Sequence, residues 1–291
     1  MFKRRKRRKQ NRRILASLLL LALLAYAALY YSNCVVKVNN YELSFAGLPA
    51  SFDGYRIAQL SDIHGGDLLG EDGEKLISAL KDEQPSIIVI TGDIADEENP
   101  PEKLRGLLLR LTALAPVYYV TGNHEWAAGC VGELEALFEE TGVTALRNEY
   151  VLLTAGGQSI ALAGIDDPNG YADRKMPPQL MRELREEQGE IFTIMLAHRP
   201  EEGAAALELG CELALSGHNH GGLIRLPWRG GLIAANRELF PEYTRGAYPM
   251  ESGSYLVVSA GLAKVGQAPR LFNPLDVPVI TLRRSASSDL T

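Results

Sequence analysis

Two histidines stand one residue apart in the stretch Leu213-Ala-Leu-Ser-Gly-His-Asn-His-Gly-Gly222, after a short apolar run and before two glycines. The chain has five histidines, and each follows a short apolar run. They are His64, His124, His198, His218 and His220. A histidine that only packs in a core has no need of the Gly, Asp or Asn neighbours that most of these have. The pattern therefore indicates a polar site.

Acidic and amide side chains occur in the same setting. The candidate metal ligands are Asp62, His64, Asp93, Asn123, His198, His218 and His220. This set of nitrogen and oxygen ligands is too rich for one ion and lacks thiolates, which favours two first-row divalent metals such as Mn, Fe or Zn. Two such ions about 3.5 to 4 Å apart can hold a phosphate and assist in-line attack on it. Taken singly, Asp62 and Asp93 would also suit helix caps.

The apolar runs predict strands, and the amphipathic segments between them predict helices. The predicted strands are Arg56–Leu60, Ser86–Ile90, Val117–Val120, Ile160–Gly164, Ile191–Leu196 and Glu212–Leu215. The predicted helices lie near Gly73–Asp82, Glu102–Leu114, Gly132–Glu140 and Gln179–Glu187. This alternation indicates an α/β fold with a buried sheet. Ligands bind beyond the carboxyl ends of such strands, so we expect the polar residues to converge there.

The part of the chain after this alternation has a different pattern. Residues 222–282 contain strands punctuated by Gly and Pro and little helix, which predicts a second, more antiparallel sheet packed on the first. Glycines at 92, 122 and 217 stand beside candidate ligands and would let the backbone turn closely around the ions. Residues 35–282 are predicted to form one domain.

Taken in order, the five polar blocks resemble those of the calcineurin-like metallophosphoesterases over roughly residues 56–222. The blocks are Ser61-Asp-Ile-His64, Thr91-Gly-Asp93, Thr121-Gly-Asn-His-Glu125, Met195-Leu-Ala-His-Arg-Pro200 and Gly217-His-Asn-His220. The resemblance implies a four-layer αββα sandwich, in which two mixed β-sheets are flanked by helices. It also implies a phosphoester or pyrophosphate hydrolase that binds two divalent metal ions.

The resemblance assigns a role to each candidate residue. The implied ligands of the first metal are Asp62, His64 and His220, with Asp93 as a carboxylate that bridges both ions. The implied ligands of the second metal are Asn123, His198 and His218. His124 is implied to be the catalytic acid that protonates the leaving group. The histidine pair at 218 and 220 would thus serve one ion each.

Further segments narrow the likeness to a membrane-associated bacterial branch of the family. They are the His-Asn-His-Gly-Gly form, Ser259-Ala-Gly-Leu262 and Arg270-Leu-Phe-Asn-Pro274. Some members of that branch cleave the pyrophosphate of UDP-2,3-diacylglucosamine or related lipid-linked phosphates. The chain departs from the pattern at Ala263-Lys264, where a glycine is expected. The expected substrate is therefore a phosphorylated small molecule or lipid.

Charge divides the chain into a basic head and an acidic body. The chain carries 30 Lys and Arg against 36 Asp and Glu, and nine of the basic residues lie in residues 1–13. Removing those nine leaves 21 basic against 36 acidic residues, a net charge of about −15, whereas counterion release from nucleic acid requires a basic surface. Nucleic acid is therefore excluded as a partner of the body.

Residues 14–31 form an uncharged apolar run of eighteen residues with tyrosines at its far end. Its length and flanks predict a transmembrane anchor with the basic head in the cytoplasm. The expected location is the cell membrane, with a single pass and the catalytic domain outside the cytoplasm. Cleavage as a signal peptide after Ala25-Tyr-Ala27, or export through the Arg12-Arg13 pair, is the competing interpretation.

Several residues have two readings. Arg199 would either bind a substrate phosphate or lie in solvent, and Asp166 and Asp167 would either face the site or support a turn. Trp126, Trp228 and Phe240 would form an apolar lip for a lipid chain or pack in the core.

Cys130 and Cys211 are expected to pack, since three cysteines without metal-like spacing form no disulfide framework. A disordered tail is predicted at 283–291.

The main functional hypothesis is a membrane-anchored phosphoesterase. A non-catalytic metal-binding receptor or scaffold on the same fold is the alternative, although a binding module has no need of the proton donor His124. A dinuclear hydrolase of amides is disfavoured by the order of the blocks.

Overall fold

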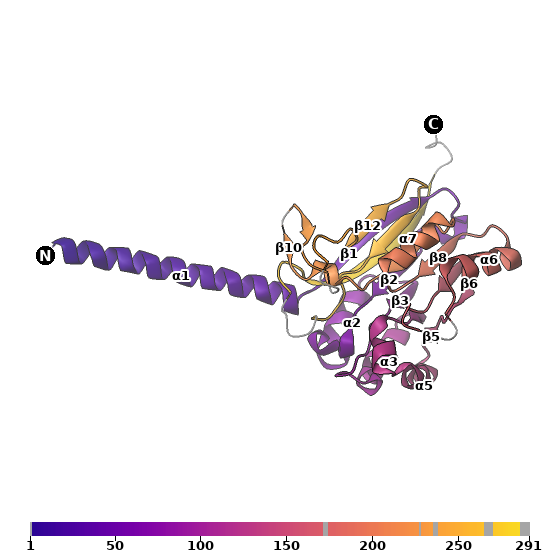
Figure 1. The fold of residues 1–291 in the computed structure, drawn as a ribbon, viewed down its shortest axis with the longest axis horizontal. Helices are drawn as coiled ribbons and strands as arrows, with labels where there is room; N and C mark the ends of the chain where they lie inside the picture. The colour runs from indigo at the N-terminus through magenta and orange to yellow at the C-terminus, as the bar shows by residue number, and fades with distance from the viewer. Residues whose placement is uncertain (1, 171–173, 227, 235–237, 265–269, 286–291) are drawn as a thin grey trace.

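A computed structural model describes residues 2–170, 174–226, 228–234, 238–264 and 270–285. A long helix, α1 (Phe2–Cys34), projects from a body built of two six-stranded sheets with helices outside them (Figure 1). The predicted α/β class with two mixed sheets flanked by helices is confirmed.

The first sheet is mostly parallel. Its strands, in spatial order, are β1 (Val36–Phe45), β14 (Leu275–Arg284), β2 (Arg56–Leu60), β3 (Ile87–Thr91), β4 (Val117–Val120) and β5 (Thr144–Ala145). β14 runs antiparallel to β2 and parallel to β1, and every other pair is parallel. The carboxyl ends of β2, β3 and β4 therefore meet at one edge of the sheet.

The second sheet combines strands from the middle of the chain with strands from the part after residue 222. Its strands, in spatial order, are β12 (Gly246–Pro249), β13 (Tyr255–Val258), β9 (Leu213–Ser216), β8 (Thr193–Leu196), β7 (Gln158–Gly164) and β6 (Glu149–Ala155). The four central strands are parallel, and only the two edge strands pair antiparallel. The prediction that residues 222–282 form a separate, more antiparallel sheet is wrong. They give two strands to this sheet, and β14 joins the first sheet.

Strand alternation explains the layers. Ile57 of β2 packs between the two sheets, together with Ile194 and Leu213 of the second sheet. The next residue, Ala58, packs on the opposite face, among side chains of the helices that cover the first sheet. Those helices are α2 (Glu74–Lys81), α3 (Arg105–Thr112) and α5 (Val131–Thr141). Because successive side chains of a strand point to opposite faces, both faces of this sheet are buried.

The second sheet has its own helical layer. α6 (Pro177–Gln188) and α7 (Pro200–Glu208) cover its outer face through a third apolar cluster, which includes Leu184 and Leu207. The remaining short elements are α4 (Asn123–Ala128), η1 (Ala50–Phe52), η2 (His64–Leu69), η3 (Glu71–Gly73), η4 (Pro101–Leu104), η5 (His220–Gly222), β10 (Arg225–Leu226) and β11 (Gly230–Gly231). Cys130 and Cys211 are buried and unpaired, as their predicted packing role requires.

At both ends of the chain, regular secondary structure extends beyond the boundaries predicted from the sequence. α1 continues the apolar run 14–31 in both directions, and residues 7–34 are long and apolar enough to cross a membrane. A signal sequence near an N-terminus has the same properties. β14 continues to Arg284, so the predicted tail begins within a strand, and residues 286–291 lie outside the described residues.

Candidate metal centre

The predicted site residues follow the carboxyl ends of five strands. Asp62 and His64 follow β2, Asp93 follows β3, and Asn123 and His124 open α4 directly after β4. His198 follows β8, while His218 and His220 follow β9. Both sheets therefore contribute to one site, as the strand-end rule predicts.

Most of the predicted ligands have an unusual backbone. Five of them lie in the left-handed region, with φ between 45° and 69°: Asp62, His64, Asp93, His218 and His220. Non-glycine residues adopt this region infrequently, and such residues gather at functional sites, where the surrounding structure compensates their cost. The loops turn sharply at the positions where the side chains converge.

The three glycines that the sequence singles out allow close backbone contacts. A Cβ at Gly92 would lie 2.7 Å from Nδ1 of His198, and one at Gly122 would lie 2.3 Å from Oδ1 of Asp93. A Cβ at Gly217 would lie 1.8 Å from Oγ of Ser61. Since real contacts of Cβ atoms are longer than this, any larger residue would push the ligand loops apart.

The side chains gather in two clusters that share Asp93. The first holds Asp62, His64, Asp93 and His220, and the second holds Asp93, His198 and His218. Within each cluster the candidate ligand atoms lie within 4.8 Å of one another. Oδ2 of Asp93 lies 3.9 Å from Nε2 of His64 and 3.2 Å from Nε2 of His198, so one carboxylate faces both clusters.

Asn123 belongs with the second cluster. Its Oδ1 lies 3.2 Å from Nε2 of His198, and Nδ1 of His218 lies 3.2 Å from the same nitrogen. In the first cluster Nε2 of His220 lies 3.3 Å from Oδ1 of Asp62. The structure thus brings all seven predicted ligands together. Their division between individual ions remains a prediction.

The chemistry of the donors fits divalent cations. Every donor is an imidazole, a carboxylate or an amide oxygen, which suits borderline and hard divalent metals. Nδ1 of His220 is buried and has no hydrogen-bond partner, although buried polar atoms are normally satisfied. Asp62 is also fully buried, and a buried carboxylate requires a compensating positive charge or hydrogen-bond donors. A cation between these side chains would meet both needs.

The pKa values show what the carboxylates do without an ion. Burial alone would lower the pKa of His198, but the charges of Asp93 and Asp62 outweigh it and raise the pKa to about 10. Burial, and then the neighbouring His198, lower the pKa of His218 to about 3. Burial raises the pKa of Asp62. These charges favour the protonated form of His198, whereas metal binding requires its neutral form.

Two acidic residues that the sequence analysis missed position the ligands. Oδ2 of Asp96 lies 2.9 Å from Nδ1 of His64. Glu125 is buried and accepts hydrogen bonds from the backbone amides of Asp93, Ile94, Ala95 and Gly122. Burial and the charge of Asp93 raise the pKa of Glu125 to about 7. Both acids lie within three residues of a predicted ligand. This proximity is the sequence feature that could have indicated their role.

The segments on which the predicted resemblance to a membrane-associated branch rests lie behind the first cluster. Gly261 packs on Asp62, and a Cβ at this glycine would lie 2.8 Å from Cβ of that aspartate. Nδ2 of Asn273 donates to the backbone oxygen of His220 at 2.7 Å. The buried guanidinium of Arg270 donates to the carbonyl oxygens of Ala260 and Ala263. These segments fix the loops that carry Asp62 and His220.

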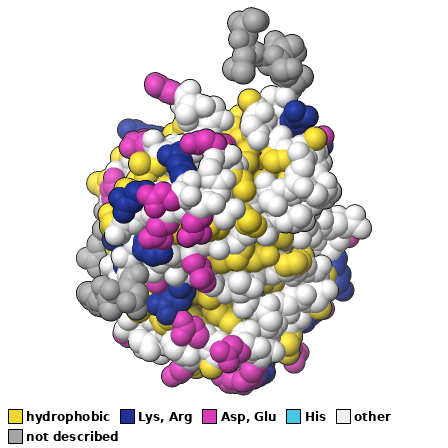
Figure 2. All heavy atoms as spheres, turned by 90° about the vertical axis from the view of Figure 1, so that its right-hand side faces the viewer, with side chains coloured by type: hydrophobic (Ala, Val, Ile, Leu, Met, Phe, Trp, Pro, Cys, Tyr) yellow, Lys and Arg dark blue, Asp and Glu magenta, His cyan; other side chains and the backbone are white. Residues whose placement is uncertain are grey.

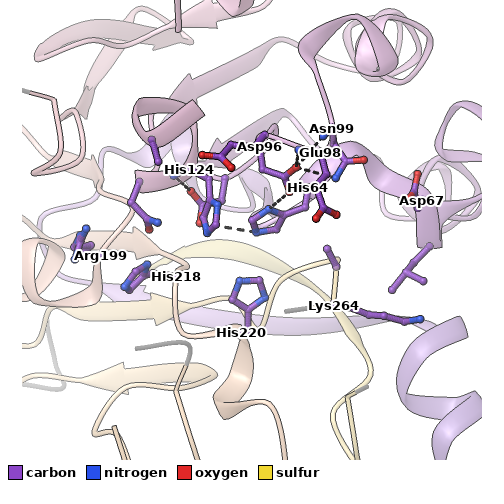
Figure 3. Close-up of a pocket in the computed structure, with 16 residues that line it drawn as sticks. His64, Asp67, Asp96, Glu98, Asn99, His124, Arg199, His218, His220 and Lys264 are labelled. Carbon is purple, nitrogen blue, oxygen red and sulfur yellow. Dashed lines mark hydrogen bonds and ion pairs between the residues drawn. The ribbon is translucent and has the colours of Figure 1, made fainter. Parts of the chain in front are cut away.

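His124 lies over the clusters without belonging to either. Its ring meets the ring of His64 edge to face with 4.7 Å between centroids, and its amide donates to Oδ1 of Asp93 at 2.9 Å. Figure 3 shows its side chain at the same pocket as His64, His218 and His220. The imidazole therefore lines the pocket without joining either cluster of candidate ligands.

Arg199 lies beside His218, at the end of the pocket away from Asp67 and Lys264 (Figure 3). Asp167 fixes it through two hydrogen bonds, from Nε at 2.8 Å and from Nη2 at 3.1 Å. Asp166 instead accepts from Thr121 and Asn148, so both aspartates support loops, in agreement with their turn or supporting role.

The pocket has a volume of about 780 Å³. Besides the site residues it is lined by Asp67, Leu68, Asp96, Glu97, Glu98, Asn99, Ala127, Ala263 and Lys264. Trp126, Trp228 and Phe240 are not among the residues that line it, so the predicted aromatic lip is absent from the described part of this pocket. Nor are Trp228 and Phe240 core residues, because both are exposed.

Comparisons with known proteins identify the family of this chain and several relatives. The family described as "Calcineurin-like phosphoesterase" matches residues 55–222. The uncharacterized metallophosphoesterase YkuE of Bacillus subtilis is 29% identical over 261 residues, which cover 88% of each chain. A bovine "transmembrane protein with metallophosphoesterase domain" is 31% identical over 84% of this chain and 57% of its own length. The solved structure of TT1561 of Thermus thermophilus, 13% identical, covers 72% of this chain and 90% of its own with a TM-score of 0.48.

The matched region contains all five polar blocks, from the Ser61 block to the pair His218 and His220, and both ligand clusters. The region that matches the family is thus the region that forms the candidate metal centre. The chain belongs to the calcineurin-like phosphoesterase family.

Proposed function

We propose that the protein is a membrane-anchored phosphoesterase that uses two divalent metal ions to hydrolyse a phosphodiester or pyrophosphate bond. The position of Asp93 carries this proposal, because its carboxylate belongs to both ligand clusters. A shared carboxylate allows two ions to act on one phosphate. Manganese, iron and zinc all suit this donor set.

The two ions, when bound, would lower the pKa of the attacking water and neutralise charge on the phosphoryl oxygens. His124 gives a proton to the leaving oxygen from its position above His64. Arg199 binds a phosphoryl oxygen through Nη1, because Asp167 occupies Nε and Nη2. Asp167 keeps the guanidinium in place before the substrate arrives.

The substrate that we propose is a lipid-linked phosphate, such as UDP-2,3-diacylglucosamine. Its support is the position of the site beside the apolar helix, since α1 contacts η2, the segment that begins at His64. Leu68 of η2 and Lys264 line the pocket and offer an apolar and a cationic contact. Figure 2 shows the face of the body opposite α1, and no histidine side chain is visible on it.

We further propose that α1 remains attached as a single transmembrane pass, with its basic head in the cytoplasm and the body outside. The basic residues of positions 3–13 support this orientation through the positive-inside rule. The structure of α1 supports retention, because Ser32 and Asn33 at its end bond to the body.

Elemental analysis of the purified full chain in detergent, followed by hydrolysis assays, tests the function. We expect two equivalents of metal, and hydrolysis of both bis-p-nitrophenyl phosphate and UDP-2,3-diacylglucosamine. Asp93→Ala serves as the control for contaminating phosphatases. Hydrolysis of the nitrophenyl ester alone would remove the lipid-linked substrate from the proposal. Two bound metals without hydrolysis of either compound would favour the non-catalytic receptor or scaffold.

A further inference from the structure

Large apolar side chains are exposed in one region of the body. Outside α1, eight large hydrophobic residues of the described chain are exposed, and five of them lie in segments 226–240 and 272. We name these five the junction patch: Leu226, Trp228, Leu239, Phe240 and Phe272. Trp228 is 102% exposed, Leu239 63% and Phe272 53%. Exposed apolar residues gathered in this way mark a surface that meets a partner.

Hydrogen bonds place this patch at the end of the apolar helix. The amide of Arg270 donates to Oδ1 of Asn33 at 3.0 Å, and Nδ2 of Asn33 donates to the carbonyl oxygen of Arg270 at 2.9 Å. The amide of Asn273 donates to Oγ of Ser32 at 3.4 Å. Phe272 therefore lies between two residues that are bonded to the last turn of α1.

The same backbone connects the rest of the patch. Leu271 pairs with the start of the β10–β11 hairpin, since its amide donates to Leu223 and its carbonyl oxygen accepts from Arg225. Leu232 donates to Ile224 and accepts from the amide of Phe240. Figure 1 shows β10 on the side of the body from which α1 projects. The patch is thus connected through neighbouring backbone to the point where the apolar helix reaches the body.

The chemistry of the patch suits the interface between lipid and water. Trp is enriched at membrane interfaces, Phe and Leu bury in the interface on the apolar face of membrane-bound segments, and a neighbouring Arg can reach the headgroups. The guanidinium of Arg229 lies 4.3 Å from the ring centroid of Phe240, which places a cation directly beside the apolar surface. An ordinary protein surface would gain nothing from exposing these rings.

Three aromatic residues of the patch also have unusual backbones. Trp228, Phe240 and Phe272 have φ of 66°, 55° and 54°. Bulky residues in the left-handed region are outliers, and such strain persists at sites where a function requires the conformation. The turn between β10 and β11 accounts for the backbone of Trp228, since the amide of Arg229 donates to the carbonyl oxygen of Leu226 at 3.2 Å. Neither a core contact nor the metal centre explains the backbones of Phe240 and Phe272, because both rings are exposed and do not line the pocket.

We propose that the junction patch is a second membrane contact, which inserts into the lipid–water interface beside α1 and fixes the body against the bilayer. The occupant is the bilayer surface, because the patch is continuous with the end of the helix that enters it. This inference rests on the proposed role of α1 as an anchor and is independent of the reaction. A body held by α1 alone would be free to tilt, whereas two contacts define its orientation.

Tryptophan fluorescence tests the proposal, because the chain has only Trp126 and Trp228. The indole of Trp126 is engaged within the body, where Nε1 donates to Oγ1 of Thr121 at 3.0 Å. The full chain is reconstituted in phosphatidylcholine vesicles that contain lipids brominated near the headgroup. We expect quenching of the wild type and of Trp126→Phe, and its loss in Trp228→Phe. Since Trp228 contacts solvent on all sides, its replacement should not disturb folding.

Flotation of the same vesicles separates the failure of the anchor from the failure of the patch. Chains that float with the vesicles while Trp228 stays unquenched would overturn the second contact and leave the anchor intact. Chains that do not float would overturn both the anchor and the contact that depends on it. Phe240→Asp should weaken the quenching of Trp228, whereas Leu152→Asp, at an exposed leucine of β6, should leave it unchanged.

Discussion

Asp96 and His64 form a pair in which Oδ2 of the aspartate lies 2.9 Å from Nδ1 of the imidazole. The pair fixes the ring so that Nε2 faces Asp93, at 3.9 Å from Oδ2. Burial alone would raise the pKa of Asp96, but the hydrogen bond to His64 outweighs it and lowers the pKa to about 2. A charged acceptor of this kind selects the tautomer and increases the basicity of a metal-binding histidine.

Asp96→Ala should therefore weaken metal binding by about 10- to 100-fold, the usual cost of losing such a partner. Asp96→Asn keeps the shape and should cost less. Titration of the metal-free protein with Mn²⁺ or Zn²⁺ against a competing chelator measures the change. Asp67→Ala, which removes another acid from the same pocket, is the matched control. Equal losses in the two alanine variants would show that the pair with His64 has no special role.

Asp93→Ala should abolish hydrolysis and remove both metals. The carboxylate belongs to both clusters, so no second residue replaces it for either ion. Elemental analysis of the purified variant gives the metal content, and bis-p-nitrophenyl phosphate gives the activity. Retention of two metals with near-native activity would rule out a bridging role.

Glu125→Ala should destabilise the body by at least ~2 kcal/mol, since each buried amide left without an acceptor costs about 1 to 3 kcal/mol. The loss arises because Glu125 accepts from four backbone amides of the two loops that carry Asp93 and Asn123. Urea unfolding in detergent measures it, and the exposed Glu139→Ala is the control. Glu125→Gln, which keeps an acceptor oxygen, should lose less stability than the alanine variant. A free energy of unfolding equal to that of the control would contradict the role.

The body should lie outside the cytoplasm, because the basic residues before the apolar helix should keep the N-terminus inside. Protease added to intact spheroplasts should then digest the body and leave a protected fragment that contains α1. Digestion only after lysis would reverse the orientation. A soluble cytoplasmic protein that stays intact in the same sample shows that the membrane is sealed.

The positions of the candidate ligands could be predicted from the sequence, because the pattern that reveals them involves only neighbouring residues. Asp62 and Asp93 each follow a buried strand within two residues, and parallel strands bring such positions together. The place of β14 was not predictable, because it depends on pairing with β1 and β2, which lie more than 200 residues earlier in the chain.

The residues that support the ligand loops could not be predicted either, because their contacts also join distant parts of the chain. Asn273 reaches the backbone of His220 across 53 residues, and local periodicity carries no information about that contact. Asp96 and Glu125 were close enough in sequence to be noticed. Their roles, however, depend on side chains that fold back toward the preceding loop, which a strand-end pattern does not reveal.

His124 separates an enzyme from a binding protein. Its backbone amide bonds to Asp93 and its ring lies against His64, yet it belongs to neither ligand cluster. A positioned general acid typically contributes about 10² to 10⁴ in rate. His124→Asn should therefore lower kcat by a factor in that range for a substrate with an alkoxide leaving group, while the metal content stays the same.

The leaving group provides the internal control for this prediction. p-Nitrophenolate departs with little need of a proton, so the loss of rate in His124→Asn should shrink for bis-p-nitrophenyl phosphate. Equal losses for both substrates would indicate that the imidazole positions the phosphate and does not protonate the leaving oxygen. A loss of metal from the variant would make His124 a ligand. Unchanged rates and metal content would remove His124 from the mechanism altogether, because an acid that is in use cannot be deleted without cost.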